Sequence, residues 1–207
     1  VWGSGFFCLS QLTTAVRIQL IIETMIGGVT MHEQLEAIEA QVGKRNFEAP
    51  PLHLWHPPLS GDIPIHITAD GTRYHEGGEI KRSAIVRLFA AILRREEDGE
   101  YYLVTPGEKW RIQVDLHPLI VTDVEREDSD VLRVTLNTGR SVTIDEDHPL
   151  FLEKSVGGVA AVKLEHGLSA LFSRAAWYRL VAMAEDHGEG PAVVSGGYQF
   201  LLAGDSG

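Results

Sequence analysis

The sequence predicts an α+β fold of two tandem related units, each with mostly antiparallel strands and one main helix. Three observations support this prediction. Short runs of alternating apolar and polar residues recur along the chain, and two helical segments resemble each other. Strands and helices do not alternate as a doubly wound parallel fold requires. We therefore expect a small barrel-like or strongly bent sheet in each unit, closed by its helix.

The first unit is assigned to residues 50–115 and begins with a strand. Ile63, Ile65 and Ile67 alternate with less apolar neighbours, a pattern typical of a half-buried strand. Asp70-Gly71 follows as a short turn signal, so residues 72–74 are expected to return as the partner strand.

A helix and a second hairpin complete this unit. Apolar residues recur at helical spacing over residues 80–93, and arginines fall mostly on the opposite face. Asp98-Gly99 is expected to end the helix. Residues 101–104 and 110–114 then predict a hairpin across Pro106-Gly107.

The second unit is assigned to residues 116–207 and contains a fainter copy of the first. Residues 82–90 align with residues 174–182, at a shift of 92. Upstream, residues 63–71 align with residues 159–167, at a shift of 96. We interpret these matches as a duplication, with extra strands ahead of the second copy.

Residues 1–49 are assigned to an N-terminal extension with a short amphipathic helix after Met31. Arg17 and Glu23 interrupt the apolar run near the start, which argues against a secretory signal or a membrane span. We expect the first 30 residues to be a flexible extension or upstream sequence, with Met31 or Met25 as the natural start.

The composition excludes several classes of function. A net charge of −11 argues against binding of nucleic acid or an anionic membrane surface, because both require a basic face. The single cysteine, Cys8, excludes an internal disulfide and a cysteine metal cluster. We therefore expect a cytoplasmic protein that binds neither nucleic acid nor membrane, while a protein partner stays open.

No catalytic motif stands out. The sequence has no P-loop, no G-x-S-x-G and no HExxH motif. Ser60, Asp62 and His66 would suit a hydrolase, but nothing in their spacing selects that chemistry. We expect no metal, no cofactor and no enzymatic activity. The four histidines that tempt a metal interpretation lack ligand spacing: His53, His56, His66 and His75.

The start of the first helix is a candidate anion site. Lys81 and Arg82 place positive charge at the positive end of the helix dipole. In the second copy, Ser173 aligns with Lys81 and is a good N-cap. Free N–H groups with Lys81, Arg82 and Lys109 would suit a phosphate or carboxylate. In the alternative, a glutamate neutralises them in an ordinary ion-pair cluster: Glu76, Glu79 or Glu108.

Neighbouring residues extend this candidate site. Glu108 and Lys109 would offer an acceptor and a donor from a tight turn. Trp110 or Trp177 would supply an aromatic wall, although Trp177 is better explained as a core residue. The full candidate ligand-binding set is Lys81, Arg82, Glu108, Lys109, Asp62, His66 and Trp110.

Over residues 50–204 the sequence resembles a bacterial family known only as a domain of unknown function. Its hallmarks stand at residues 61–71, 80–89, 98–109 and 148–150. The resemblance implies a duplicated barrel-like core and a C-terminal domain similar to pleckstrin-homology folds. It also implies a site between the domains for a nucleotide-like ligand, and a role in signalling.

The chain departs from the family pattern at Leu116-His117-Pro118-Leu119, so the resemblance assigns no role to His117. These observations together predict a protein that binds or senses an anionic, nucleotide-like ligand in signal transduction. The alternatives are a hydrolase with a His/Asp site and a protein–protein adaptor.

Overall fold

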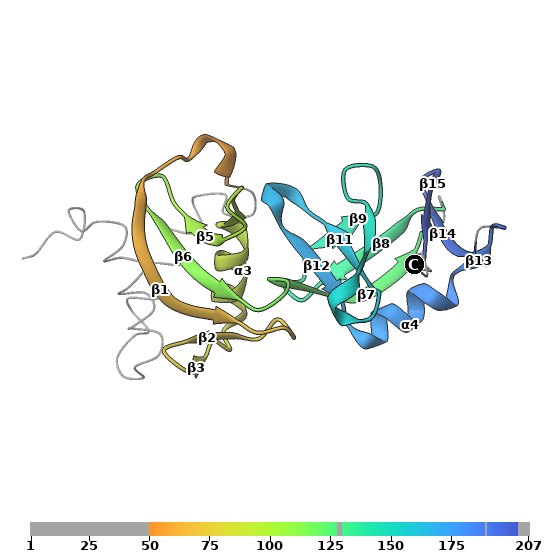
Figure 1. The fold of residues 1–207 in the computed structure, drawn as a ribbon, viewed down its shortest axis with the longest axis horizontal. Helices are drawn as coiled ribbons and strands as arrows, with labels where there is room; N and C mark the ends of the chain where they lie inside the picture. The colour runs from red at the N-terminus through yellow and green to blue at the C-terminus, as the bar shows by residue number, and fades with distance from the viewer. Residues whose placement is uncertain (1–49, 128–129, 189, 203–207) are drawn as a thin grey trace, which may run out of the picture.

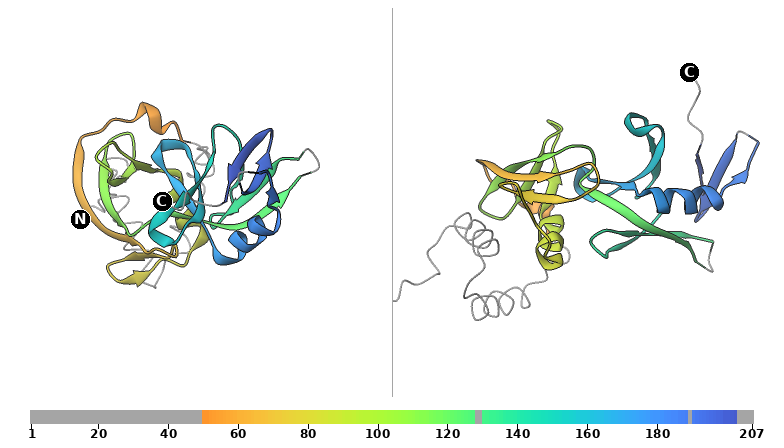
Figure 2. Two further views of the ribbon diagram at one scale, coloured as in Figure 1. Left: turned by 45° about the vertical axis from the view of Figure 1, so that its right-hand side comes forward. Right: turned by 90° about the horizontal axis from the view of Figure 1, so that it is seen from below.

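The computed structural model describes residues 50–127, 130–188 and 190–202. These residues form an N-terminal domain (strands β1–β6 and helix α3) and a C-terminal domain (strands β7–β15 and helix α4). The two domains lie side by side along the long axis of the molecule (Figure 1). The view from below also shows two distinct domains (Figure 2, right). The short helix expected after Met31 lies outside the described residues.

The N-terminal sheet has six strands in the order β3-β2-β1-β6-β5-β4. Each of its two halves is an antiparallel meander, and the parallel pair β1 and β6 joins the halves. Helix α3 connects the two meanders. The bounds are β1 (Leu59–Ile67), β2 (Arg73–His75), β3 (Gly78–Glu79), α3 (Ser83–Ala91), β4 (Leu93–Arg95), β5 (Tyr101–Val104) and β6 (Lys109–Val114).

The C-terminal sheet repeats this topology in the order β10-β11-β12-β7-β8-β9, with β7 and β12 as the parallel pair. Helix α4 follows β12, and a three-stranded sheet β13-β14-β15 ends the chain. The bounds are β7 (Leu119–Arg126), β8 (Leu132–Leu136), β9 (Ser141–Thr143), β10 (Leu150–Glu153), β11 (Val159–Lys163), β12 (Ser169–Phe172), α4 (Arg174–Ala182), β13 (Glu185–Asp186), β14 (Pro191–Ser195) and β15 (Tyr198–Leu201).

The α+β class and the two tandem related units are confirmed. The sheets are open rather than closed barrels, because β3 and β4 form free edges in one sheet and β10 and β9 in the other. The pleckstrin-homology likeness of the C-terminal domain stays a prediction.

The repeat has two levels. As the sequence alignment indicated, β11, β12, α4 and β13–β15 follow the same order as β1, β2, α3 and β4–β6. Their pairing differs, because β1 pairs with β6 while β12 pairs with the earlier strand β7. The matching sheets are therefore β1–β6 and β7–β12, and their helices occupy different places in the order.

The predicted helix, which was expected to end only at Asp98-Gly99, was too long. Helix α3 ends at Ala91, and Leu93–Arg95 turns back as strand β4 against β5. Leu93 is buried in β4, and its spacing would also place it on the apolar face of a longer helix. Apolar periodicity therefore does not reveal the change from helix to strand.

The strand alternation of β1 separates the two faces of the N-terminal sheet. Ile63, Ile65 and Ile67 are buried in the same core cluster as Ile85 and Phe89 of α3. The alternate positions of β1 therefore project from the opposite face of the sheet.

Four residues, 115–118, link β6 to β7. The Asp115 backbone N–H donates to the Ile67 carbonyl at 3.0 Å. Buried Arg73 of β2 donates to the Pro118 carbonyl at 3.0 Å, and burial lowers its pKa to about 10. The N-terminal domain thus holds both ends of the linker.

No helix in the described ranges is both long and apolar enough to cross a membrane.

Gly71 and Gly77 provide a matched test of the domain contact. Both have a positive φ, +82° and +84°. A Cβ at Gly71 would lie 2.5 Å from Cγ1 of Ile120 in the C-terminal domain, whereas a Cβ at Gly77 meets nothing within 4 Å. Backbone strain of about 1–2 kcal/mol applies to both alanine variants. Overpacking should cost Gly71→Ala about 1–3 kcal/mol more, measured by urea unfolding. Equal losses would contradict the close approach of Gly71 to Ile120.

Candidate ligand-binding groove

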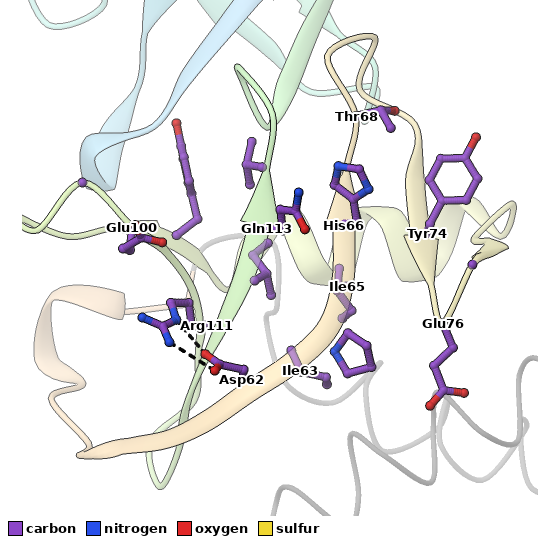
Figure 3. Close-up of a pocket in the computed structure, with 16 residues that line it drawn as sticks. Asp62, Ile63, Ile65, His66, Thr68, Tyr74, Glu76, Glu100, Arg111 and Gln113 are labelled. Atoms are coloured by element: carbon purple, nitrogen blue, oxygen red, sulfur yellow. Dashed lines mark hydrogen bonds and ion pairs between the residues drawn. The ribbon is translucent and has the colours of Figure 1, made fainter.

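A broad groove with a volume of about 810 Å³ lies along β1, β2 and β6 of the N-terminal domain (Figure 3). Polar side chains of β1 and β6 enter it from the strand positions that face away from the α3 core, and two glutamates enter it from outside the strands. The lining residues used below are Asp62, Pro64, His66, Tyr74, Glu76, Glu100, Arg111 and Gln113.

An ion pair joins Asp62 of β1 to Arg111 of β6. The parallel register places the two residues opposite each other. Arg111 Nε lies 2.6 Å from Asp62 Oδ1, and Nη2 lies 3.1 Å from Oδ2 (Figure 3). The hydrogen bond from Arg111 lowers the pKa of Asp62, and the bond in turn raises the pKa of Arg111. The side chains are 67% and 42% exposed, so solvent screens the pair and a ligand has access to it.

A second polar pair lies toward the other end of β1. His66 Nε2 lies 2.7 Å from Oδ1 of the linker residue Asp115. Both side chains are more than a third exposed. The Gln113 side chain, from the neighbouring strand β6, lies close to His66 (Figure 3). The groove therefore offers a guanidinium, an imidazole and an amide from two adjacent strands.

The remaining lining residues limit the charge of a ligand. Tyr74 and Pro64 provide apolar surface, while Glu76 and Glu100 add carboxylates to that of Asp62. These carboxylates disfavour a polyanion, because like charges repel in a shared site.

Asp62 and His66 both line the groove, yet each has another partner. Ser60 accepts a hydrogen bond from the Lys109 backbone N–H at 3.2 Å. The combination of Ser60, Asp62 and His66 that would suit a hydrolase is therefore not assembled.

Lys109 lies outside the groove in an ion-pair network. Its Nζ lies 2.7 Å from Glu96 Oε2 and 4.7 Å from the ring centre of Tyr102. Arg94 donates to the other oxygen of Glu96 at 2.5 Å and to the backbone carbonyls of Leu52 and Trp55. Burial acts to raise the pKa of Glu96, but the bonds from Lys109 and Arg94 outweigh it and lower the pKa. Lys109 therefore lies in an ion-pair cluster, the alternative to an anion site. Its partner is Glu96, which was not among the glutamates expected from the sequence.

Lys81 and Arg82 lie at the start of α3, separate from Lys109. Lys81 is 77% exposed, and its Nζ lies 3.5 Å from Glu79. Arg82 occupies the N-cap position without a side-chain cap, whereas Ser173 caps α4 by accepting from the Ala176 N–H, as expected. Lys109 and the start of α3 lie toward opposite ends of β1. Lys109 pairs with Leu59, the first residue of β1. Arg73 pairs with Ile67, the last residue of β1, and its carbonyl accepts from the Ile80 N–H just before α3.

Glu108 and Trp110 form a local contact at the beginning of β6. The Trp110 indole N–H donates to Glu108 Oε2 at 3.4 Å. The Trp110 ring also covers Gly61, where a Cβ would lie 3.4 Å from the ring. Glu108 and Trp110 do not line the groove. Trp177 of α4 packs against the hydrophobic core, as the sequence indicated.

A buried polar cluster at the linker was not anticipated. His117 Nδ1 lies 2.7 Å from Ser169 Oγ, and Nε2 lies 3.2 Å from Glu153 Oε2. Ser155 donates to the other carboxylate oxygen through both its N–H and its hydroxyl. His117 and Ser169 are at most 8% exposed, and none of the cluster lines the groove. The cluster resembles a serine–histidine–acid triad, but His117 and Ser169 are buried, and their bonds join the linker to the C-terminal domain.

In the part of the chain that the structure describes, no group of three or more His, Cys, Asp or Glu residues is placed to hold a metal ion.

The fold and groove define a two-domain α+β protein with a groove along its N-terminal sheet. Residues 50–116 match the N-terminal domain of a family described as a domain of unknown function, DUF1285. Residues 118–202 match its C-terminal domain. The chain therefore belongs to the DUF1285 family, which confirms the resemblance found in the sequence.

Two solved structures are similar to this chain. A DUF1285 family protein from Silicibacter pomeroyi DSS-3 is 36% identical, with a TM-score of 0.71 over 80% of this chain and 93% of that chain. A DUF1285 family protein from Shewanella baltica OS155 is 31% identical, with a TM-score of 0.51 over 58% of this chain and 91% of that chain. No curated protein matches the chain.

The Lys109 network yields a stability prediction. Glu96→Gln should destabilise the fold by about 1.5–3 kcal/mol, because Lys109 and Arg94 lose a charged acceptor in a site that is 23% exposed or less. Glu97→Gln, at an exposed neighbouring position, should change stability by less than about 0.5 kcal/mol. Urea unfolding at pH 7 measures both. Because the pKa of Glu96 is lowered, its contribution is present above its ordinary pKa and disappears as the pH falls through the lowered value. Equal stabilities of the two variants would contradict this role for Glu96.

Proposed function

We propose that this protein is a non-catalytic binding module that holds a small polar ligand in the groove of its N-terminal domain. The observation that carries the proposal is the exposed Asp62–Arg111 pair within a concave surface that also contains His66. A ligand that brings its own charge can replace half of an exposed ion pair at little cost, because solvent already screens that pair.

The proposed ligand carries no more than one carboxylate or phosphate group. Arg111 and His66 suit an anionic oxygen, since a guanidinium forms two parallel hydrogen bonds with such a group. The carboxylates of Asp62, Glu76 and Glu100 favour an additional amino group and disfavour a polyphosphate. Tyr74 offers a ring on which a base or another flat group would stack. A nucleoside monophosphate or an amino acid combines these features.

We further propose that the protein acts in signal transduction in the cytoplasm. The short linker supports a role as a sensor, since Asp115 contacts both the groove residue His66 and the backbone at the end of β1. A change at the groove would therefore reach the linker directly. The single cysteine suits a reducing compartment.

A thermal-melt screen of the full chain tests the binding proposal. The probes are AMP, cyclic AMP, ATP, inorganic phosphate, arginine and glutamate. A probe at 100 times its dissociation constant should stabilise the chain by about 2.7 kcal/mol. For a chain of this length, that corresponds to a rise in Tm of roughly 5–11 °C. AMP or an amino acid should raise Tm more than ATP or phosphate.

Matched variants locate the site. Arg111→Gln and His66→Gln should each weaken binding roughly 10- to 100-fold, the equivalent of one lost charged hydrogen bond. Lys81→Ala and Arg82→Ala remove comparable charge outside the groove and should leave the affinity unchanged. A loss of binding in the Lys81 and Arg82 variants alone would contradict the groove and support the start of α3.

A further inference from the structure

The internal repeat leaves strand β15 (Tyr198–Leu201) with a free edge. Residues 193–200 align with residues 103–110 at a shift of 90, so β15 corresponds to β6 of the first unit. Strand β6 pairs with β5 on one edge and with β1 on the other. In the second unit, β11 corresponds to β1 but pairs with β10 and β12 instead. Strand β15 therefore pairs with β14 alone, at the end of the molecule away from the N-terminal domain (Figure 1).

The outward-pointing backbone groups of β15 belong to Gln199 and Leu201. The Leu202 N–H donates to the Pro191 carbonyl at 2.8 Å, so these two opposed residues form a hydrogen-bonded pair. Hydrogen-bonded and non-hydrogen-bonded pairs alternate along an antiparallel ladder, so the backbone groups of Phe200 also point toward β14. Gln199 and Leu201 therefore direct their N–H and C=O groups away from β14. Within the described residues, no second strand pairs with this edge.

The side chains of β15 are uncharged and incompletely buried. Tyr198 and Phe200 share one face of the strand, and their ring centres lie 6.4 Å apart. Phe200 lies opposite the buried Val193 of β14 and packs against the edge of the hydrophobic core. Because Phe200 is only partly buried, a further strand beside β15 would extend the core past it.

Among the described strands, the other free edges have features that oppose pairing with another molecule. Strands β3 and β13 are two residues long and acidic. Strand β4 contains Arg94 and Arg95 and lies against the turn η4 (Glu165–Gly167). Strand β10 ends with Glu153, and β9 has three residues. Charge and short length protect a sheet edge, and β15, with four uncharged residues, has neither.

We propose that β15 is a self-association edge, at which two molecules of this chain pair their β15 strands around a two-fold axis. Such an axis makes identical strands antiparallel and the shared surface self-complementary. An axis at Phe200 places Gln199 of each molecule opposite Leu201 of the other, so every outward N–H and C=O of these residues gains a hydrogen bond. Phe200 then lies opposite Phe200 of the other molecule, and the two cores meet. This pairing does not depend on the proposed ligand.

The acidic character of the chain does not oppose this register. The Tyr198 hydroxyl donates to Glu146 Oε2 at 2.5 Å, so the acidic residues 145–147 lie near one end of β15. In the antiparallel pair the two Tyr198 residues are separated by about 14 Å along the strands. That separation exceeds the Debye length of about 8 Å at physiological salt, so the repulsion is screened. Because a single short strand buries little surface, we expect a weak, reversible dimer.

Single-cysteine variants test the register. Phe200→Cys and Gln199→Cys are oxidised in a full-length Cys8→Ser background at physiological salt, and covalent dimer is followed on non-reducing gels. Opposed Cα atoms of a non-hydrogen-bonded pair lie about 4.5 Å apart, within the range of a disulfide. The two Gln199 Cα atoms would lie roughly 8 Å apart, too far for a disulfide without backbone movement. Phe200→Cys should therefore cross-link about tenfold faster, although Gln199 is the more exposed residue.

A proline variant tests the same edge without altering Phe200. Gln199→Pro removes one outward N–H from each molecule, while the hydrogen bonds to β14 remain. Dimerisation, measured by sedimentation equilibrium, should weaken roughly 10- to 100-fold, the equivalent of two lost hydrogen bonds. Gln199→Ala keeps the N–H and should dimerise like the unaltered chain. Far-UV circular dichroism shows whether each variant is folded.

Three results would overturn the proposal. The first is an unaltered chain that stays monomeric at every concentration in the sedimentation experiment. The second is equal cross-linking of Phe200→Cys and Gln199→Cys, and the third is equal dimerisation of folded Gln199→Pro and Gln199→Ala. If Gln199→Pro does not fold, the comparison of the two cysteine variants decides.

Discussion

The parallel pairing of β1 with β6 is the constraint on which the N-terminal domain depends. Parallel strands require a long crossover, and here the crossover contains α3, which packs against the inner face of the open sheet. Three contacts between the paired strands and their flanks join residues separated by 49 positions: Ser60 with Lys109, Asp62 with Arg111 and His66 with Asp115. The polar pairs of the groove therefore exist only because the first and last strands of the domain are neighbours.

The same constraint recurs in the C-terminal domain, where β7 and β12 form the parallel pair. Only four residues, 115–118, connect β6 of the first parallel pair to β7 of the second. Buried Arg73 of the N-terminal domain binds the linker at Pro118, and buried His117 of the linker binds Ser169 of the C-terminal domain. Ion pairs satisfy many of the other charged groups, including Lys109 and Glu96, so the exposed groove pairs are the more accessible candidates for a ligand.

Local sequence patterns predicted much of the fold. The alternation of Ile63, Ile65 and Ile67 located β1 and the outward face that carries Asp62 and His66. The end of α3 was predicted wrongly, because Leu93 is apolar and buried in β4 just as it would be in a helix. That error extended the predicted helix to Asp98-Gly99, across Arg94 and Glu96, and hid the partner of Lys109.

Partners that depend on strand register were beyond local patterns. Nothing near Arg111 or Asp115 indicates which residues of β1 they oppose, since that depends on a pairing across 49 positions. His117 stood out only as a departure from the family pattern, and its partners Glu153 and Ser169 become neighbours through the order of the C-terminal sheet.

Two-dimensional amide NMR of the full chain, titrated with the probe that raises Tm most, tests the central claim most directly. If the ligand lies on the paired strands, the largest shift changes will fall in residues 62–66 and 111–115. Shift changes concentrated at residues 81–83 and 108–110 would place the ligand elsewhere. That result would contradict the assignment of the groove as the binding site.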